Sequence, residues 1–344
     1  CAHLGYCDIG CDVLAKNTLD RNYLYVAENK YHADVRPLCL VERIELLADG
    51  TYRVSYSHVK PGEPQSDAET APIVIVAAGS LGSTELLLRA RDVHRTLPRI
   101  SDRLGKGWSA NGDFLTPAFY EREIDAHIGP TIGAAIDFHQ RSRGTLSFWI
   151  QDGGIPDLAL GYLLHKLDDP TIGVPQRLVL EAIRSLLRTD DPLRFVMPWF
   201  AQGVDAGDGV LSLAAGSGNS NGGDLRLDWN VASSQPLITA IIDMHKQLTA
   251  NTGGHALVPP SWEFFKELIT PHPLGGCNMG TTAQDGVVDA SGQVFGYPNL
   301  YVADGAIVPR ALGVNPSRTI GALAELIAQG IVGGRQVPTA AAGG

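Results

Sequence analysis

The pattern of apolar and polar positions predicts α/β segments at both ends of the chain and a strand-rich region between them. The strongest strand signal is the run 72–79, where consecutive apolar residues lead into Gly79 and a helix predicted over 80–88. A fully apolar strand that enters a helix through a glycine turn is typical of a parallel sheet buried on both faces. A second apolar strand, 299–305, ends in Asp-Gly and precedes a helix predicted over 317–329, with Pro316 in its first turn.

Shorter periodic segments predict the remaining elements. Near the start we expect a helix within 12–30 capped by Asn17 or Thr18, a hairpin of strands 38–46 and 52–56 turning at Asp49-Gly50, and a polar loop over 60–70. Between 113 and 270, alternation over 145–150, 194–200, 210–214 and 224–229 predicts an antiparallel sheet, with helices near 176–188 and 235–250. The Gly-rich stretch 216–223 lies between two alternating strands, which predicts a hairpin tip rather than a phosphate-binding loop.

Composition and charge narrow the class of protein. The 344 residues are 44% hydrophobic and 19% charged, which suits two folded domains rather than a disordered chain. The net charge of -10 argues against nucleic acid as a partner, because nucleic-acid binding needs cationic side chains. No uncharged apolar run reaches the ~18–20 residues of a transmembrane segment, so we expect a soluble protein, cytoplasmic or secreted. The chain begins with Cys1 and shows no signal-peptide pattern, so we expect it to start within a longer protein or after processing.

The cysteines suggest two alternatives near the start of the chain. Cys1, Cys7 and Cys11 surround His3, a grouping that would suit a metal or iron–sulfur site if a fourth ligand were present. The simpler interpretation is a Gly-rich loop with buried or occasionally paired thiols, and we favour it. The remaining two cysteines, Cys39 and Cys277, are expected to fill the core.

Three segments are candidates for one site, because open α/β sheets bind ligands at the carboxyl ends of their strands. Ala78-Gly79 and Asp304-Gly305 end the two apolar strands, and Asn315-Pro316 begins a helix whose free N–H groups favour negative charge. His272 stands between two prolines and is followed by paired glycines, so rigid backbone holds it. A structural role for this His is the alternative.

Several long, collinear runs resemble the glucose–methanol–choline (GMC) flavin oxidoreductases, and within them the bacterial cholesterol oxidase branch. The runs that carry the resemblance are 15–20 with Tyr23-Leu24, 77–87, 105–112, 272–280, 288–289, 299–305 and 313–320. The implied fold class is α/β plus α+β: a Rossmann-like FAD-binding domain, discontinuous and incomplete over 1–112 and 285–335, with an inserted antiparallel-sheet substrate domain over 113–284. We expect residues 336–344 to be a disordered tail.

The resemblance implies FAD as cofactor and oxidation of an alcohol by hydride transfer to flavin N5. His272 and Asn315 correspond to the catalytic His–Asn pair, which handles the substrate hydroxyl and its proton. The implied cofactor-binding residues are Val41 by the adenine, Ala78 and Gly79 near the dinucleotide, Asn111 and Gly112 beside the isoalloxazine, Asp304 and Gly305 along the ribityl and pyrophosphate, and Asn315 with Pro316 at the helix start. No metal site is implied.

The sequence departs from the family pattern in two places. It lacks the family's opening strand–GxGxxG–helix unit, so we expect a fragment, a chain completed by a partner, or a loss of FAD binding. A substrate-domain Glu, which cholesterol oxidases use to isomerise the steroid double bond, is missing from the aligned stretch Leu193–Phe195. Isomerase activity is therefore not expected, and sterol is one candidate substrate.

The substrate is expected to be a hydrophobic alcohol, with Phe148, Trp149, Trp199 and Phe200 as candidates for lining its pocket or filling the core. The electron acceptor, oxygen or another, is left open. Two alternatives remain: a truncated or partner-dependent chain that is catalytically inactive, and a flavin-containing lyase without net redox chemistry.

Overall fold

The computed structural model describes residues 1–7, 10–59, 66–126, 128–139, 146–154, 192–214 and 223–333, and the chain divides into two compact units. Unit 1 comprises Cys1–Val35, Asp113–Gly203 and Pro236–Ile269, and unit 2 comprises Arg36–Gly112, Val204–Gln235 and Thr270–Gly344. These bounds differ from the predicted domains, because 1–35 belongs to unit 1 while 204–235 and 270–284 belong to unit 2. The predicted cofactor and substrate roles of the domains stay predictions.

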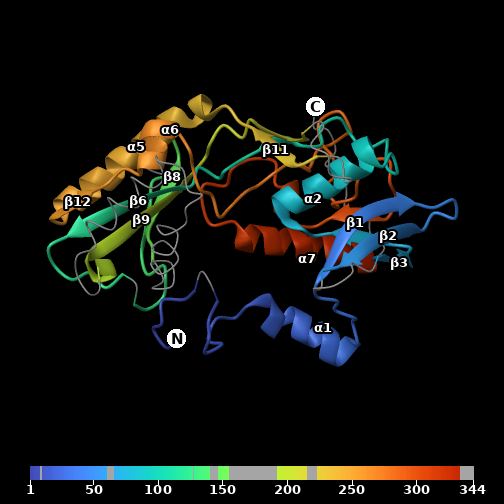
Figure 1. The fold of residues 1–344 in the computed structure, drawn as a ribbon, viewed down its shortest axis with the longest axis horizontal. Helices are drawn as coiled ribbons and strands as arrows, with labels where there is room; N and C mark the ends of the chain where they lie inside the picture. Colours follow the sequence, from blue (N-terminus) through green and yellow to red (C-terminus); the bar gives the residue numbers. More distant parts are fainter. Residues whose placement is uncertain are drawn as a thin grey trace. The chain divides into compact units, whose positions relative to one another are not determined.

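Unit 1 is built on a five-stranded antiparallel sheet in the order β12-β6-β9-β8-β7 (Figure 1). Its strands are β6 (Phe114–Tyr120), β7 (Ala135–Asp137), β8 (Phe148–Asp152), β9 (Val196–Gly203) and β12 (Gly254–Ala256), with a 3-10 turn, η3 (Pro192–Phe195), leading into β9. Side chains alternate between the two faces of such strands, and β6 shows this plainly: Phe114, Thr116, Ala118 and Tyr120 are all buried. The predicted antiparallel sheet is therefore present.

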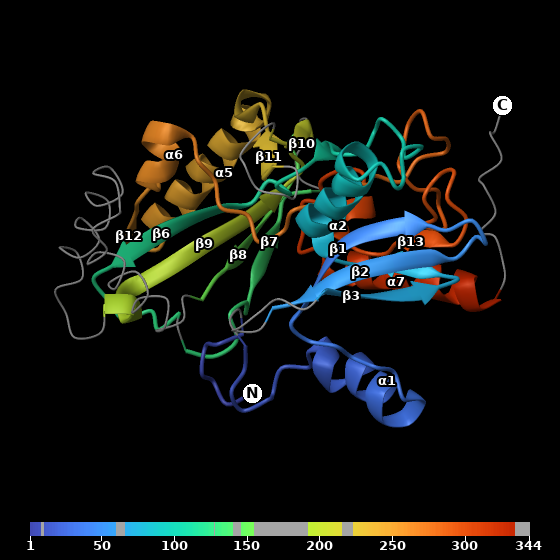
Figure 2. The same cartoon turned by 45° about the vertical axis from the view of Figure 1, so that its right-hand side comes forward.

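Helices α5 (Val231–Asn251) and α6 (Pro260–Phe265) run beside this sheet (Figure 2). The indole N–H of Trp199 in β9 donates to Thr249 Oγ1 of α5 at 3.0 Å, so one face of the sheet packs on α5. Phe114 meets Trp262 of α6 edge-to-face, with 5.6 Å between ring centroids. Helix α5 confirms the helix predicted near 235–250. The helix predicted over 176–188 lies outside the described residues.

The N-terminal helix of unit 1 is shorter than predicted. A 3-10 turn, η1 (Leu19–Arg21), precedes α1 (Tyr23–Tyr31), and residues 11–18 are irregular apart from a turn at 12–13. The expectation of a cap at Asn17 or Thr18 was wrong. Asn22 caps α1 instead, its side-chain oxygen accepting from the Tyr23 N–H at 2.5 Å.

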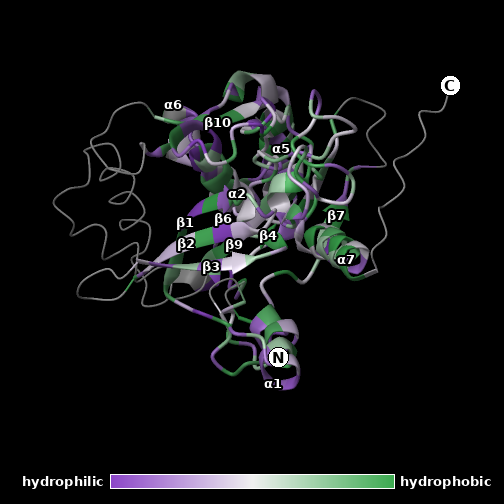
Figure 3. Ribbon diagram, turned by 90° about the vertical axis from the view of Figure 1, so that its right-hand side faces the viewer, coloured by the Kyte–Doolittle hydropathy of each residue, from purple (hydrophilic) through white to green (hydrophobic). Residues whose placement is uncertain are grey.

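Unit 2 contains an antiparallel sheet of β1 (Cys39–Leu46), β2 (Tyr52–His58) and β3 (Ser66–Ala71). The β1–β2 hairpin confirms the prediction, and hydrophobic and hydrophilic bands alternate along its strands in Figure 3. The expected loop over 60–70 was partly wrong, because 66–71 pairs with β2 as an edge strand. The side chains of β3 are almost all exposed, which is why its sequence is polar.

A parallel pair lies at the centre of unit 2: β4 (Val74–Val76) aligns with β13 (Leu300–Val302), so that Val76 is opposite Val302. Each strand leads into helices, β4 into α2 (Gly79–Leu88) and its π-turn η2 (Arg89–Val93), and β13 into η4 (Gly305–Ile307) and α7 (Ser317–Gly333). Both predicted strand–helix units are confirmed. The expectation of burial on both faces was wrong for β4 as described, since Ile75 is 48% exposed between the buried Val74 and Val76.

The third sheet of unit 2 pairs β5 (Lys106–Trp108), β10 (Gly209–Leu213) and β11 (Leu225–Asp228). The sequence pattern predicted that β10 and β11 belong to the inserted sheet. Instead, β10 pairs with β5, a strand about a hundred residues earlier in the chain. Strands β10 and β11 are antiparallel, as predicted for a hairpin, while residues 215–222 between them lie outside the described residues. The tail 336–344 also lies outside them.

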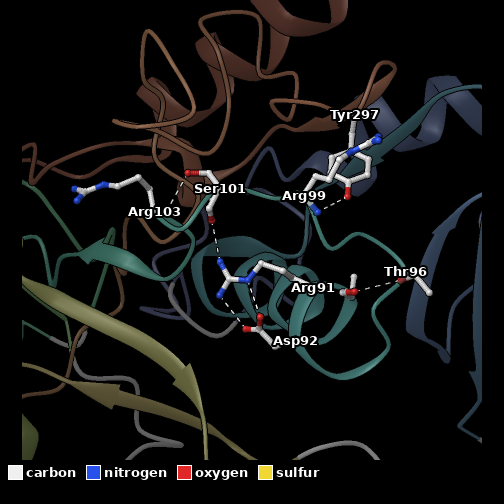
Figure 4. A network of polar contacts seen from close by, with 8 residues as sticks. Arg91, Asp92, Thr96, Arg99, Ser101, Arg103 and Tyr297 are labelled. Carbon is white, nitrogen blue, oxygen red and sulfur yellow. Dashed lines mark hydrogen bonds and ion pairs between the residues drawn. The ribbon is translucent and has the colours of Figure 1, made fainter.

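A network of polar groups holds the connection between η2 and β5 (Figure 4). Arg91 pairs with Asp92 and donates to the Ser101 carbonyl at 2.8 Å. The Tyr297 hydroxyl accepts from the Arg99 N–H at 2.8 Å, and the Arg99 guanidinium lies 5.1 Å from the centre of the Tyr297 ring. These contacts anchor the connection to the loop that precedes β13.

Across the part of the chain that the structure describes, no helix combines the length and apolar character needed to cross a membrane.

The buried side chain of His245 is expected to make the stability of unit 1 depend on pH. It is fully buried in α5, its Nδ1 lies 2.8 Å from Thr116 Oγ1, and burial lowers its pKa to about 3. The unfolded His binds a proton below its ordinary pKa of ~6.5 while the native one stays neutral, so stability is lost as the pH falls from 6.5 toward 3, with a slope of up to about 1.4 kcal/mol per pH unit. We expect His245→Gln to flatten the loss of unfolding free energy between pH 6.5 and 4, measured by urea titration.

The matched control for this prediction is His255→Gln, which changes an exposed His in β12. It is expected to keep the wild-type slope. Parallel pH profiles for wild type and His245→Gln would contradict the prediction.

Candidate functional site

The carboxyl ends of β4 and β13 lie side by side and bring four predicted site residues together. Ala78 and Gly79 follow β4, and Asp304 and Gly305 follow β13. The Asp304 carboxylate accepts from the Gly79 N–H at 2.9 Å and from the Ser83 hydroxyl, and it caps η4 by accepting from the Ala306 N–H at 2.8 Å. The Ala78 N–H in turn donates to Ser83 Oγ at 2.9 Å.

The role of Asp304 follows from these bonds. Both of its oxygens are occupied by donors of the protein itself, and only 8% of the residue is exposed. A carboxylate used in this way locks the two strand ends in place, because a buried charge is stable only while its hydrogen bonds are made. The sequence predicted the position of Asp304 at the site but not its bond to Ser83, since nothing in the spacing links residues so far apart.

Gly79 begins α2 in a conformation that suits a ligand-binding turn. Its φ of +78° lies in the left-handed region, and a Cβ added to it would meet no atom within 4 Å. The glycine is therefore required by its backbone angle rather than by crowding, and space is open beside the helix start. Helix α2 has ten residues, and its start carries the positive end of the helix dipole.

The segment that carries His272 is fixed along its whole length. Ser109 and Leu274 exchange two backbone hydrogen bonds of 2.9 and 3.0 Å, and the N–H groups of Gly275 and Cys277 donate to the carbonyls of Gly305 and Ala306, both at 2.9 Å. The paired glycines permit this packing. A Cβ on Gly275 would lie 2.3 Å from the Gly107 carbonyl oxygen, and one on Gly276 would lie 2.2 Å from Thr84 Oγ1.

The turn Ser109–Gly112, which contains the predicted Asn111 and Gly112, joins the His272 segment to the Asn315 segment. The Asn111 amide accepts from the N–H groups of Leu312 and Gly313 at 2.9 and 3.0 Å and donates to the Val314 carbonyl at 2.9 Å. Asn315 follows at once. Pro316 then accepts the first helical hydrogen bond of α7, from the Ile320 N–H at 2.9 Å.

Sequence reasoning missed Asp205, whose carboxylate accepts four hydrogen bonds, three of them from this turn. The donors are Ser109 Oγ, Ala110 N and Gly112 N in the turn, at 2.7, 2.9 and 3.2 Å, and Gly207 N at 3.0 Å. Burial raises the pKa of Asp205, and the hydrogen bonds oppose that rise. Asp205 is one of two Asp residues in a Gly-rich loop and resembles an ordinary solvated turn residue, so the sequence carried no signal for this role.

Other candidates lie apart from this group. Val41 is in β1, 39% exposed, and no hydrogen bond among the described residues joins it to the strand ends. Cys1 is exposed, and Cys7 and Cys11 are half-buried; all three are free thiols. The described residues contain no cluster of three or more His, Cys, Asp or Glu side chains able to hold a metal ion, so nothing among them supports the metal alternative.

The other two cysteines differ in burial. Cys277 is fully buried and burial raises its pKa to about 12, which suits the predicted core role. Cys39 is only half-buried, so it does not fill the core as expected.

The four aromatic residues proposed for a pocket divide between the two faces of the unit 1 sheet. The register sets Trp149 opposite Gln202, which places Trp149 on the same face as Phe200. Phe148 is opposite Gly203 and therefore lies on the same sheet face as Trp199, the face that packs against α5. Gln151 and Gln202 share the face of Trp149 and Phe200. Gln202 is fully buried, and neither end of its amide has a partner among the described residues.

Comparison with known proteins gives a consistent result. Residues 224–324, which include His272 and Asn315, match the family model described as GMC oxidoreductase. Cholesterol oxidase of Mycobacterium tuberculosis is 31% identical to this chain, over 94% of the chain and 58% of its own length. Cholesterol oxidase of Acinetobacter baumannii is 30% identical, over 94% of the chain and 60% of its own length. The chain therefore spans about three-fifths of the length of these relatives.

Among solved structures, pyridoxine 4-oxidase from Mesorbium loti resembles this chain with a TM-score of 0.57 at 16% sequence identity. The match covers 86% of this chain and 57% of that one, and it shows a shared fold.

Asp304→Ala tests the lock between the strand ends. The change leaves the Gly79 and Ala306 N–H groups and the Ser83 hydroxyl without their acceptor, and hydrogen bonds to a charged group are each worth about 1.5–3 kcal/mol. We expect the free energy of unfolding, from urea titration, to fall by about 2–4 kcal/mol. Asp102→Ala, at an exposed carboxylate, is the control and should stay within about 0.5 kcal/mol of wild type. Equal stabilities of the two variants would contradict the assigned role.

Proposed function

Because this chain belongs to the GMC oxidoreductase family, we propose that its protein oxidises a hydrophobic alcohol with a bound FAD. The observation that carries the proposal is the turn Ser109–Gly112, which holds the segments of both His272 and Asn315 by direct hydrogen bonds. His272 and Asn315 lie 43 positions apart in the sequence, and this turn fixes the segments that carry them to one rigid element.

The residues of unit 2 fit a flavin dinucleotide. Helix α2 starts beside open space at Gly79, and α7, with 17 residues, starts just after Asn315 and Pro316. Two helix starts of this length supply positive dipole ends, which suit the anionic pyrophosphate and a ring that gains negative charge. FAD, when bound, accepts the hydride that leaves the alcohol carbon.

The chemistry left to the protein is the handling of one hydroxyl proton. In this proposal the His272 imidazole binds the substrate hydroxyl and takes its proton as the C–H bond breaks, because an imidazole nitrogen can act as a general base toward a hydroxyl. Asn315 orients the substrate with its amide, and the start of α7 stabilises negative charge that develops nearby. Asp304 acts only indirectly, by holding the strand ends.

A hydrophobic substrate is supported by the relatives and by the sheet of unit 1. Both relatives described above are cholesterol oxidases. Trp149 and Phe200 are half-buried on one sheet face, next to the buried amides of Gln151 and Gln202. An apolar surface with a few amides suits a largely apolar alcohol that carries a second polar group. The stretch Leu193–Phe195 supplies no Glu, so we expect oxidation without movement of a double bond.

His272→Ala tests the catalytic assignment in the flavin-loaded protein. We expect anaerobic reduction of the flavin by a hydrophobic alcohol to slow by about 10²–10⁴-fold, the usual contribution of a general base. The rate of reduction is measured from the bleaching of the flavin's visible absorbance. His255→Ala, which changes an exposed His of β12, is the control and should reduce at the wild-type rate.

The same experiment separates the alternatives. An unchanged rate in His272→Ala would overturn the role of His272. Wild-type flavin that never bleaches would favour a lyase, and a protein that never acquires flavin would favour the inactive chain. Reoxidation of the reduced flavin, measured once with oxygen and once with an artificial acceptor, identifies the class of electron acceptor.

Phe200→Ala tests the substrate face. Removing a large apolar side chain from a binding surface costs about 1.5–3 kcal/mol, so we expect KM for a long apolar alcohol to rise by about 10–100-fold, with little change for a short alcohol. Trp199→Phe keeps an aromatic ring on the opposite face of the same strand and should leave the ratio of the two KM values near that of wild type. An unchanged ratio in Phe200→Ala would place the substrate elsewhere.

A further inference from the structure

We propose that Asp205 is a positioning residue that holds both His272 and Asn315 in their working places through the turn Ser109–Gly112. The inference rests on the proposed function of those two residues. Asp205 itself lies in the loop between β9 and β10, and the hydrogen bonds of its carboxylate end on the turn and on Gly207. Its influence on the site passes through other residues.

The four bonds to Asp205 divide evenly between its two oxygens. Oδ1 accepts from Ser109 Oγ and Gly207 N, and Oδ2 accepts from Ala110 N and Gly112 N. All three backbone donors are N–H groups, which can only donate, so each oxygen must remain an acceptor. An amide in place of the carboxylate would turn one of the two positions into a donor and leave an N–H without a partner. The four donors around Asp205 therefore require a carboxylate rather than an amide.

The turn needs this support because its backbone is strained. Asn111 has a φ of +55° and is fully buried, and Gly112 has a φ of +60°. A left-handed conformation in a residue other than glycine costs free energy and persists only where the surroundings hold it. Ser109 Oγ also accepts from the Asn111 N–H at 2.9 Å, so the hydroxyl that donates to Asp205 fixes the strained residue as well.

From the turn, one path leads to Asn315. The side-chain amide of Asn111 makes three hydrogen bonds to the backbone of 312–314, the residues immediately before Asn315. A rotation of the Asn111 backbone would break all three together, because the amide is planar and its bonds share one orientation. The start of α7 would then lose its anchor.

A second path leads to His272. Thr270 Oγ1 donates to the Ala110 carbonyl at 3.1 Å and accepts from the His272 N–H at 3.0 Å. On the other side of His272, Leu274 is bonded twice to Ser109. His272 is thus held between two attachments to the same turn. A displacement of about 1 Å in a catalytic group can cost about 10²-fold in rate.

Hydrogen exchange tests the first path without any assay of activity. The amides of Leu312 and Gly313 donate to Asn111 and make no bond to Asp205. If Asp205→Asn loosens the turn, these two amides should exchange about 10–100-fold faster, matching the loss of about 1.5–3 kcal/mol expected for a charge-assisted bond. The control is Asp208→Asn, with the same change of charge at an exposed position three residues on. It should leave exchange at 312–313 unchanged.

Kinetics test the consequence for the site. In the flavin-loaded protein, we expect Asp205→Asn to slow anaerobic flavin reduction by about 10–100-fold with KM changed less than threefold, since the substrate surface is untouched. If Asp205 acts through the turn, Asp205→Asn and Asn111→Ala combined should slow reduction by less than the product of the two separate effects. Asp208→Asn should reduce at the wild-type rate.

The outcomes distinguish a failure of the positioning role of Asp205 from a failure of the proposed function. Normal exchange at 312–313 in Asp205→Asn, or an effect on rate that simply multiplies with that of Asn111→Ala, would overturn the positioning role. If the wild-type flavin is not reduced by any alcohol, the proposed function fails, while the exchange experiment still decides the structural path. Should Asp205→Asn not fold, Ser109→Ala, which deletes one of the four donors, is expected to show the same pattern with a smaller effect.

Discussion

The parallel pairing of β4 with β13 is the constraint on which the rest of unit 2 depends. It joins segments separated by more than two hundred residues, and it sets the residues after both strands next to each other. Only because Val76 is opposite Val302 can the Asp304 carboxylate reach the Gly79 N–H and the Ser83 hydroxyl. The start of α2, the turn η4 and the His272 segment are then built on this fixed edge.

Two carboxylates perform the same physical task at different places in unit 2. Asp304 and Asp205 are both surrounded by N–H and O–H donors of tight turns. Removing a carboxylate from water is costly, and the cost is met only if the donors keep their exact arrangement. Each carboxylate therefore selects one geometry of the backbone around it. At the candidate site this selection replaces the freedom that loops normally have.

Much of unit 2 was predictable, since its signals are local. An apolar run followed by glycine predicted β4 and α2, and Asp-Gly followed later by Asn-Pro predicted β13 and α7. The hairpin of β1 and β2 followed from alternation and a turn. Errors arose where a tertiary partner decided the outcome. The polar strand β3 has no apolar pattern of its own and exists because β2 offers it an edge, and the pairing of β10 with β5 depends on proximity in space.

For the site, the sequence by itself determined which residues are candidates: a His between prolines, an Asn-Pro helix start, and the glycines that a left-handed or crowded backbone requires. The tertiary structure alone decided how they are held. Asp205 acquires its role from four donors that folding brings to it, and the turn Ser109–Gly112 connects His272 and Asn315 through hydrogen bonds spanning up to 203 residues. Such bonds leave no periodicity or spacing in a sequence, because they depend on where the backbone passes in space.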